Sequence, residues 1–437
     1  MKNKKLLFLA GALAFSAGTL VSCGGTPATT SEGTTSQPTT SEGTTSEEAT
    51  SQIDRSKSLV IWSSAEDIKD GGFMDQAIAA FKEANPTVVE GIEFVTVAVG
   101  EGDAATQVKN DPDASADVFH FAGDQLGSLV QGGYLATIPT ALTTNLGIEE
   151  EVLEAGQVSG SQYGIPFTPN TFFLYYDASI FSADDVKSFN TMMSKDLGSY
   201  KYALSLDVAN GWYLQSYFFS AGCTIYGEDG SDMSKGVEPA ATGEKVAEWV
   251  WNYYNGANAK KLYNTDGSAN IGVDTAAGVT GTWNAGTIKK NIEAAGGIYA
   301  AAPLPAVDFN GDGVEEAWQS VGDYKQIGIN KVTTHATLAT RFATFLASSE
   351  MQQLRYTLRA TAPTNKAAAE SDTIKNDIAV VAQTAQLANT FNQPSVYSAA
   401  GYWDKAGAFG ADLKACEEGE IGDYFASFQN ALVANAE

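Results

Sequence analysis

Apolar residues between positions 59 and 81 come first as a continuous run and then at helical spacing. Leu59-Val60-Ile61-Trp62 is a compact apolar run, which is typical of a buried strand. Met74, Ile78 and Phe81 then recur at the spacing of one helix face, and Asn85-Pro86 predicts the end of that helix. We therefore expect a strand followed by a helix.

The same alternation continues toward residue 126. Residues 92–97 are rich in β-branched side chains and predict a second strand, after which Asp103 is placed to cap a helix. Residues 116–121 predict a third apolar strand that runs into a turn of small residues and another helix. Strands that alternate with helices predict a mostly parallel sheet covered by helices, and hence an α/β fold.

The carboxyl-terminal third is expected to be mainly helical. One apolar helix face is formed by Leu338, Phe342, Phe345 and Leu346. Ser349 with Gln352 has the spacing of a capping box, so a further helix should begin there.

The first 22 residues have the layout of an export signal. Lys2, Lys4 and Lys5 precede an apolar run over residues 6–20, and small residues follow. A transmembrane anchor is the alternative, but this run of 15 residues is shorter than the roughly 20 that a spanning helix needs. We therefore predict that residues 1–22 are a signal peptide.

A lipid attachment site and a tether follow the signal. Leu20-Val21-Ser22-Cys23 resembles a bacterial lipobox, which implies cleavage before Cys23, a diacylglycerol on its thiol and an acyl chain such as palmitate on its amine. Residues 23–57 are mostly Thr, Ser, Glu, Gly and Pro and carry almost nothing that a core could use. We predict a disordered tether that holds the body to the outer, extracellular face of the bacterial cell membrane.

The rest of the chain is long enough for two lobes and strongly acidic. About 380 residues follow the tether, and chains longer than roughly 250 to 300 residues usually divide. Without the three signal lysines there are 23 basic and 52 acidic residues, so the body should repel nucleic acid and anionic lipid. Solubility is the simplest reason for this charge, and a cationic ligand is the alternative.

Cysteine and histidine are too few to suggest a metal centre. Cys223 and Cys416 form either a disulfide or two buried free thiols, and we favour the free thiols. His120 and His335 are far apart in the sequence, and no zinc-ligand or catalytic-triad spacing is present. We expect no cofactor and no metal.

Residues 308–313 begin like a calcium-binding loop. Asp308, Asn310 and Asp312 place oxygens at alternate positions, and Gly313 follows. An EF-type loop needs a bidentate Glu at its twelfth position, where this chain has Gln319. We therefore favour a hairpin turn between two strands over a calcium site.

Several short motifs appear in a fixed order along the body. They are Leu59-Val60-Ile61-Trp62, Ala116-Asp117-Val118-Phe119 with Asp124, Tyr163-Gly164-Ile165-Pro166, Leu174-Tyr175-Tyr176-Asp177, Gly281-Thr282-Trp283, Ala302-Pro303-Leu304-Pro305 and Thr361-Ala362-Pro363-Thr364. Their order and spacing resemble the extracellular solute-binding proteins of ABC importers, within these the maltose- and maltodextrin-binding branch. The resemblance extends from Leu59 to about Phe409.

The resemblance implies two α/β lobes of the type II periplasmic-binding fold, with a ligand cleft between them. The chain would cross between the lobes near residues 165–167, 303–305 and 362–364. The N-terminal lobe would then comprise residues 58–166 plus 305–363, and the C-terminal lobe residues 167–304 plus 364–437.

A sugar presents apolar CH faces and a rim of hydroxyl groups, so its site needs aromatic rings and planar polar groups. Trp283 matches a position where the family stacks an aromatic ring on the ligand. The other aromatic residues that the resemblance places at the ligand are Trp212, Trp403, Tyr402 and Phe121. For each of them, packing in the core is the alternative.

Four polar residues are carried over in the same way, because a carboxylate accepts hydrogen bonds from two neighbouring hydroxyls. They are Ser64, Glu66, Asp124 and Asn170. The alternative for each is a solvated loop or a helix cap. Asp67 stands where close relatives of the family have a basic residue, which is a departure from the pattern.

These observations predict a monomeric substrate-binding lipoprotein that captures a maltodextrin-type oligosaccharide for an ABC permease, and not an enzyme. A cell-surface glycoside hydrolase is one alternative, but neither a hydrolase order of segments nor a catalytic motif is present. A binder of polyamines, peptides or iron complexes is another. Tyr175-Tyr176 does not favour iron, because neighbours on a strand point to opposite faces.

Overall fold

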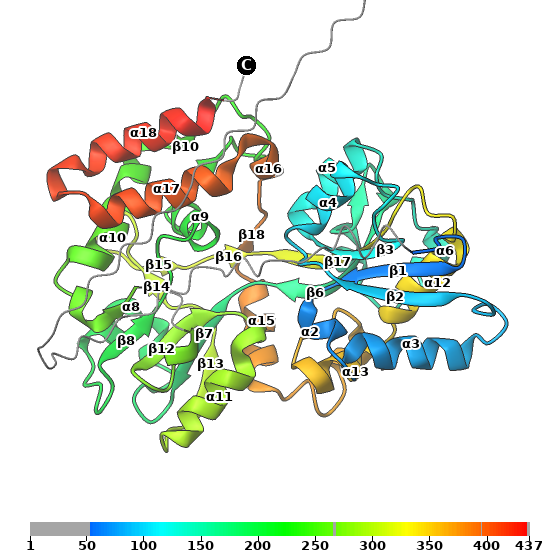
Figure 1. The fold of residues 1–437 in the computed structure, drawn as a ribbon. Helices are drawn as coiled ribbons and strands as arrows, with labels where there is room; N and C mark the ends of the chain where they lie inside the picture. Colours follow the sequence, from blue (N-terminus) through cyan, green and yellow to red (C-terminus); the bar gives the residue numbers. More distant parts are fainter. Residues whose placement is uncertain (1–52, 265–267, 395, 435–437) are drawn as a thin grey trace, which may run out of the picture. The chain divides into compact units, whose positions relative to one another are not determined.

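The computed structural model describes residues 53–264, 268–394 and 396–434, which form two five-stranded sheets with helices on both faces (Figure 1). The first sheet has the order β2-β1-β3-β17-β6. Its strands are β1 (Ser58–Ser63), β2 (Glu93–Ala98), β3 (Val118–Ala122), β6 (Gly164–Asn170) and β17 (Asp323–Ile329). The second sheet has the order β11-β8-β12-β7-β13. Its strands are β7 (Phe173–Asp177), β8 (Tyr202–Ser205), β11 (Leu262–Tyr263), β12 (Thr275–Thr280) and β13 (Tyr299–Ala302).

Both sheets are mixed. In the first sheet β1 pairs in parallel with β2 and β3, whereas β17 runs antiparallel to both β3 and β6. The second sheet repeats this division, since β8 has parallel neighbours and β7 has antiparallel ones. The α/β class is confirmed, but the expectation of a mostly parallel sheet was wrong. The alternation at residues 59–126 carries no information about β17, which joins from a distant part of the chain.

Alternate residues of β1 pack into two separate cores. Leu59 and Ile61 contact the cluster built with α3 and α12, whereas Val60 and Trp62 contact the cluster built with α4 and α5. Figure 1 shows α3 and α13 on one side of the sheet and α4 and α5 on the other. The helices of this lobe include α2 (Ala65–Ile68), α3 (Phe73–Ala84), α4 (Ala104–Asn110), α5 (Leu126–Gln131), α12 (Ala336–Leu346) and α13 (Ser349–Arg359).

The second sheet is built in the same way. Leu174 and Tyr176 of β7 belong to the large core cluster, while Phe173 and Tyr175 belong to a smaller one with α11 and α15. Tyr175 and Tyr176 are both buried on opposite faces, so they form no paired site. The helices here are α8 (Phe189–Ser194), α9 (Gly211–Ser220), α10 (Ala240–Asn255), α11 (Ala285–Ala294), α15 (Ile378–Leu387), α16 (Tyr397–Ala400), α17 (Tyr402–Ala415) and α18 (Ile421–Val433).

Shorter elements connect these layers. The short helices are α6 (Thr140–Thr143), α7 (Glu150–Glu154) and α14 (Lys366–Ala369). The two-residue strands pair as β4 (Gln157–Val158) with β5 (Ser161–Gln162), β9 (Thr224–Ile225) with β10 (Val237–Glu238), β14 (Ala306–Val307) with β15 (Glu316–Ala317), and β16 (Ser320–Val321) with β18 (Thr390–Phe391).

Two passages of the chain between the sheets can be followed in the described residues. Residues 165–167 lie inside β6 of the first sheet, and the passage to the second sheet follows Asn170. The return passage includes β16, which pairs in parallel with β18 just before β17 begins at Asp323. The exact lobe boundaries given above stay predictions.

Two helix starts differ in detail from the expectation. Asp103 precedes α4, but its side chain accepts no capping hydrogen bond. The cap of α13 is Ser348, whose hydroxyl accepts from the N–H of Met351, so the capping box predicted at Ser349 was wrong by one residue. The carboxyl-terminal third is mainly helical, as expected.

The turn at residues 308–313 joins β14 to β15 and is a hairpin, as the sequence indicated. Its Asp308 carboxylate accepts the backbone N–H groups of Gly311 and Gly313. Within the described residues no group of metal-ligating side chains is found. Cys223 and Cys416 are buried free thiols, and burial raises the pKa of the Cys223 thiol to about 12.

The predicted signal peptide at residues 1–22, Cys23 and the tether up to residue 52 lie outside the described residues. The prediction that the tether extends to residue 57 was wrong, because Ile53 packs against a core cluster and Arg55 donates to the backbone oxygens of Ala114 and Ser115. In the part of the chain that is described, helices with the length and apolar character of a membrane span are absent.

Candidate functional site

A cleft of about 400 Å³ lies between the two sheets and takes its lining from both lobes. Most of its residues follow the ends of strands or lie on helix α13, and strand ends are where open α/β sheets bind ligands. The lining consists of Ser64, Glu66, Glu101, Thr168, Pro169, Asn170, Trp212, Thr282, Trp283, Lys325, Arg355, Arg359 and Thr361.

Two indole rings form the wall contributed by the second lobe. Trp212 starts α9, where Asn210 Oδ1 caps its N–H at 2.9 Å, and Trp283 lies in the turn after β12. Their ring centroids are 5.7 Å apart, and Trp283 is 45% exposed although it is a large apolar side chain. Gly281 makes this position possible, because a Cβ there would lie 2.0 Å from the Trp283 ring.

Trp212 is fixed more firmly than Trp283. Its ring meets Phe172 edge-on at 4.9 Å and lies 5.2 Å from Tyr213. One indole is therefore anchored by the core of the lobe, while its neighbour leaves nearly half of its surface free for a ligand.

Two arginines from α13 form the opposite wall with a buried carboxylate behind them. Arg355 and Arg359 are four residues apart and so share one helix face. Arg355 Nη2 lies 3.0 Å from Asp67 Oδ2, and Arg359 Nη1 also donates to Asp67. Burial by itself would raise the pKa of Asp67, but the two guanidinium groups lower it to about 2. Asp67 therefore holds both arginines in place as a charged group.

Asp67 is the residue at which this chain departs from the family pattern, and its contacts show what the acid does there. A basic residue was expected at its position, and here the acid stands there instead. The cationic groups of this wall are Arg355 and Arg359 of α13, which pair with Asp67. Glu66, the neighbour of Asp67, is largely exposed and lies 3.9 Å from Arg359.

A second acid–base pair lies on the first lobe. Lys325 of β17 is 3.6 Å from Glu101, which follows β2, and both line the cleft. Burial would raise the pKa of Glu101, but Lys325 outweighs this effect and the pKa is lowered. The carboxylate is therefore ionised near neutral pH and can accept hydrogen bonds from ligand hydroxyls.

Asn170 connects the cleft to a pair of acids behind it. Its side chain hydrogen-bonds to Asp323, which also accepts the backbone N–H of Gly123. Burial and the neighbouring charge of Asp124 raise the pKa of Asp323 to about 7. Asp124 is itself half-buried, hydrogen-bonds to Gln393, and has a pKa raised by burial.

The structure gathers five of the nine residues that the sequence proposed for the ligand, and these are Ser64, Glu66, Asn170, Trp212 and Trp283. Asp124 is not among the lining residues and reaches the cleft only through Asp323 and Asn170. Trp403 is half-buried against Tyr397 and Tyr402, beside the start of α9.

Phe121 and Tyr402 lie in the core instead of the cleft. Phe121 has no exposed surface and packs on Phe119 at 5.7 Å. Tyr402 is also fully buried, stacked on Tyr397 at 3.8 Å, with its hydroxyl donating to Gly211 O at 3.3 Å. Both residues therefore pack in the core, which was the alternative given for them.

The residues that sequence reasoning missed are mostly charged. They are Glu101, Lys325, Arg355 and Arg359, together with Thr168, Pro169, Thr282 and Thr361. The spacing of Arg355 and Arg359 signals a shared helix face, but nothing local shows that this face meets α2. Glu101 lies between Gly100 and Gly102, just past the end of β2, which is a position where ligand groups occur.

The sequence profile of the bacterial extracellular solute-binding proteins matches residues 76–382. The chain belongs to this family. A curated relative is a maltooligosaccharide ABC transporter solute-binding lipoprotein of Streptococcus pneumoniae serotype 4 (strain ATCC BAA-334 / TIGR4). It is 24% identical to this solute-binding protein over 358 residues, which is 76% of this chain and 81% of the relative.

Solved structures share the fold. One that contains acarbose has a TM-score of 0.76 at 28% identity, with 87% of this chain and 99% of that one covered. The maltodextrin-binding protein MalE1 from L. casei BL23 without ligand has a TM-score of 0.70 at 23% identity, covering 86% of this chain and 98% of MalE1. The two-lobed type II fold of this solute-binding protein is thereby confirmed.

Proposed function

We propose that this solute-binding protein captures a neutral oligosaccharide of the maltodextrin type in the cleft and delivers it to an ABC permease. The observation that carries the proposal is that the cleft has two different walls. Trp212 and Trp283 form one wall, and ionised or amide groups form the other. A stack of sugar rings needs both kinds of surface at once. The names of the curated relative and of the solved structures support the same ligand class.

The mechanism rests on the origin of the two walls. The indoles belong to the second lobe, whereas Glu66, Glu101 and the arginines belong to the first. A sugar that touches both walls stabilises the closed arrangement over the open one and shifts the equilibrium between them by that difference in affinity. The closed, loaded form is then the one that docks on the permease.

The place of action follows from the amino-terminal segment. We propose cleavage before Cys23, lipidation of that residue and a tether over residues 23–52, which together hold the monomeric body at the extracellular face of the cell membrane. The name of the curated relative, a lipoprotein, supports this anchor. In cell fractionation, Cys23→Ser should move the protein from the membrane to the soluble fraction, and unchanged membrane retention would count against the anchor.

We also propose that the protein is not an enzyme. The family consists of solute-binding proteins, and each carboxylate that lines the cleft lies near a cation, Glu101 beside Lys325 and Glu66 3.9 Å from Arg359. We therefore expect maltooligosaccharides to be recovered unchanged after incubation with the protein.

Thermal melting of the chain from residue 23 onward with Cys23→Ser tests the ligand class. The panel contains maltose, maltotriose, longer dextrins, spermidine and a peptide mixture. A ligand that binds only the native state adds about 2.7 kcal/mol to its stability at a hundredfold excess over the dissociation constant. We expect the dextrins to raise the melting temperature.

The matched variant is Trp283→Ala, which removes the exposed indole and should abolish the shift. A shift with spermidine or peptide alone would overturn the ligand class but keep the fold. Equal shifts for the parent chain and Trp283→Ala would place the sugar outside the cleft.

A further inference from the structure

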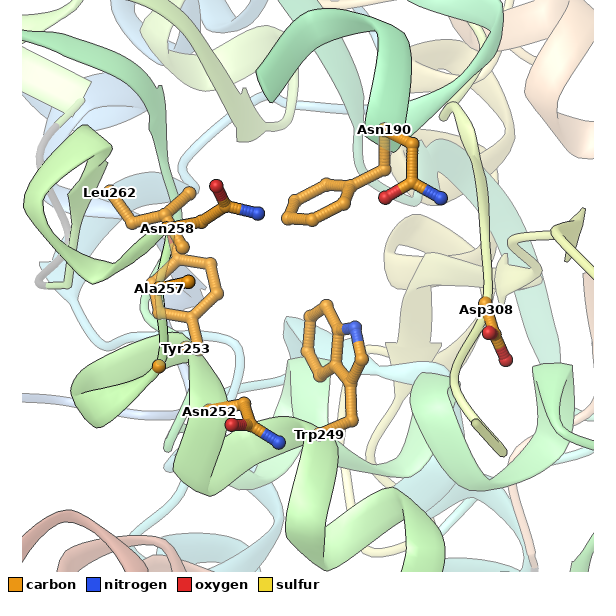
Figure 2. A pocket seen from close by; sticks show the side chains of 10 residues that line it. Asn190, Trp249, Asn252, Tyr253, Ala257, Asn258, Leu262 and Asp308 are labelled. Carbon is orange, nitrogen blue, oxygen red and sulfur yellow. The ribbon is translucent and has the colours of Figure 1, made fainter. Parts of the chain in front are cut away.

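A second hollow lies within the second lobe and shares no lining residue with the cleft (Figure 2). Its volume is about 250 Å³, and its walls come from α8, from the end of α10 and from the loop that follows α10. It is lined by Phe189, Asn190, Trp249, Asn252, Tyr253, Gly256, Ala257, Asn258, Leu262 and Asp308.

Trp249 of α10 supplies an aromatic surface at this hollow. Its ring packs edge-on against Phe309 at 4.7 Å and lies 5.1 Å from Tyr217, so the core holds it in place. The side chain is nevertheless only half-buried, and Figure 2 shows the indole rising into the opening. Its Nε1–H has no hydrogen-bond partner among the described residues, whereas that of Trp251 on the same helix donates to Cys416 O.

Side-chain amides face the indole. Asn190 and Asn258 are both exposed, and neither carboxamide group has a partner in the described parts of the chain. Figure 2 shows the amide of Asn258 reaching into the opening from one side, with Asn190 on the other. Each amide offers two N–H donors and one carbonyl acceptor, so each can bind a hydroxyl as donor and as acceptor.

The hollow offers no free charge to a ligand. Asp308 is the one charged residue of the lining given above, and its carboxylate already accepts the N–H groups of Gly311, Asp312 and Gly313 at 2.7, 3.1 and 2.9 Å. An anionic ligand would therefore lose hydration here without gaining a counter-ion, and a cationic one would find only a carboxylate that already accepts three hydrogen bonds. The lining favours a neutral molecule.

We propose that this hollow is a second carbohydrate site, which takes one ring of a neutral sugar with the ring on Trp249 and its hydroxyls on Asn190 and Asn258. The volume lies just below the range of roughly 300 to 1,000 Å³ that holds drug-sized ligands, so it suits a single ring. The ring belongs either to a free oligosaccharide or to a polysaccharide chain that would keep the protein near its source of ligand. The site goes beyond the proposed function, because it does not touch the cleft.

The test uses the chain from residue 23 onward with Cys23→Ser and Trp283→Ala, which weakens the cleft. Maltose is the free probe, glycogen the polysaccharide probe and adenosine the non-sugar probe. The signal of the Trp249 indole N–H in a ¹⁵N-labelled sample reports maltose and adenosine, with Trp249→Phe used to assign it. Retardation in native gels that contain glycogen reports the polysaccharide.

We expect maltose to shift the Trp249 signal, glycogen to retard the protein, or both, which distinguishes the two sources. Adding Asn190→Ala with Asn258→Ala should weaken the effect at least about tenfold, since two hydrogen bonds are lost. Asn255→Ala is the matched control, because this exposed amide lies on α10 outside the hollow. If maltose and glycogen had the same effect on the Asn190→Ala, Asn258→Ala variant as before, or if adenosine alone shifted the Trp249 signal, the proposal would be overturned.

With Trp283 intact, this asparagine variant should keep the rise in melting temperature that sugar causes by binding in the cleft. Loss of binding at the hollow can therefore be told apart from loss of binding in the cleft.

Discussion

Arg355 Nη2 lies 3.0 Å from Asp67 Oδ2, and both side chains are almost completely buried beneath one wall of the cleft. The two residues are 288 positions apart in the sequence. Arg355 also lies over the ring of Phe167 at 4.5 Å and donates to Thr168, so the pair ties α2, α13 and β6 together. Arg359, which lines the cleft, is held by the same carboxylate.

Replacing Asp67 with Asn should destabilise the first lobe by about 3 kcal/mol, because the guanidinium groups of Arg355 and Arg359 would both lose the buried carboxylate that pairs with them. The effect should depend on pH. The folded-state pKa of Asp67, about 2, is below the ordinary aspartate value of 3.8, so its contribution is fully present above pH 4 and is lost as the pH falls toward 2. Urea unfolding at pH 7 and at pH 3 measures both effects.

The matched control is Asp70→Asn, since Asp70 is an exposed acid just beyond α2. This change should leave the free energy of unfolding within about 0.5 kcal/mol of the parent. Equal destabilisation by the two substitutions would show that general charge, and not the buried pair, is responsible.

The two indoles of the cleft should respond differently to truncation. Trp283→Ala should weaken maltodextrin binding about 10- to 100-fold and change stability by less than about 1 kcal/mol, because the side chain is 45% exposed. Trp212→Ala should weaken binding and also cost about 3 kcal/mol of stability, because it removes packing against Phe172 and Tyr213. Isothermal titration calorimetry and urea unfolding separate the two effects.

The control for Trp212 is Trp251→Ala on α10, which removes a half-buried indole outside the cleft. It should lower stability without changing the affinity for sugar. If it lowered the affinity as much as Trp212→Ala does, loss of lobe stability would explain both results and the stacking role would fail.

The polar and aromatic residues at strand ends were indicated by the resemblance to the solute-binding family and not by local patterns alone. Ser64 follows β1 directly, and Trp283 follows β12, so a correct strand assignment already places both at the edge of a sheet. A local sequence pattern cannot show whether an aromatic side chain packs in the core or faces the cleft. Phe121 lies on β3, and its ring is covered by the cluster with α4 and α5 and by Gly164 and Gly328 of the distant strands β6 and β17. Arg355 was missed for the same reason, because its partner Asp67 is set by the packing of α13 near α2 and not by any local signal.

Asp323 should make the protein less stable at alkaline pH than at acidic pH. Its folded-state pKa, about 7, lies above the ordinary aspartate value of 3.8, so its contribution is fully present below pH 4 and is lost as the pH rises through 7. Burial and repulsion by Asp124 cause the raised pKa, while the hydrogen bond from Asn170 opposes it. Asp323→Asn removes the charge and keeps an acceptor for Asn170. It should therefore stabilise the protein by about 2 kcal/mol at pH 8, with allowance for partial solvent contact, and by much less at pH 5.

Urea unfolding of the parent and of Asp323→Asn at a series of pH values measures this difference. Asp113→Asn is the control, since Asp113 is an exposed acid away from the cleft, and its effect should not change between pH 5 and pH 8. A stability difference for Asp323→Asn that stayed constant over this range would mean that Asp323 keeps one protonation state throughout. Because Asn170 lines the cleft, the same titration should also shift sugar affinity. Tighter binding at pH 5 than at pH 8, lost in Asp323→Asn, would connect the buried acid to the ligand through that single amide.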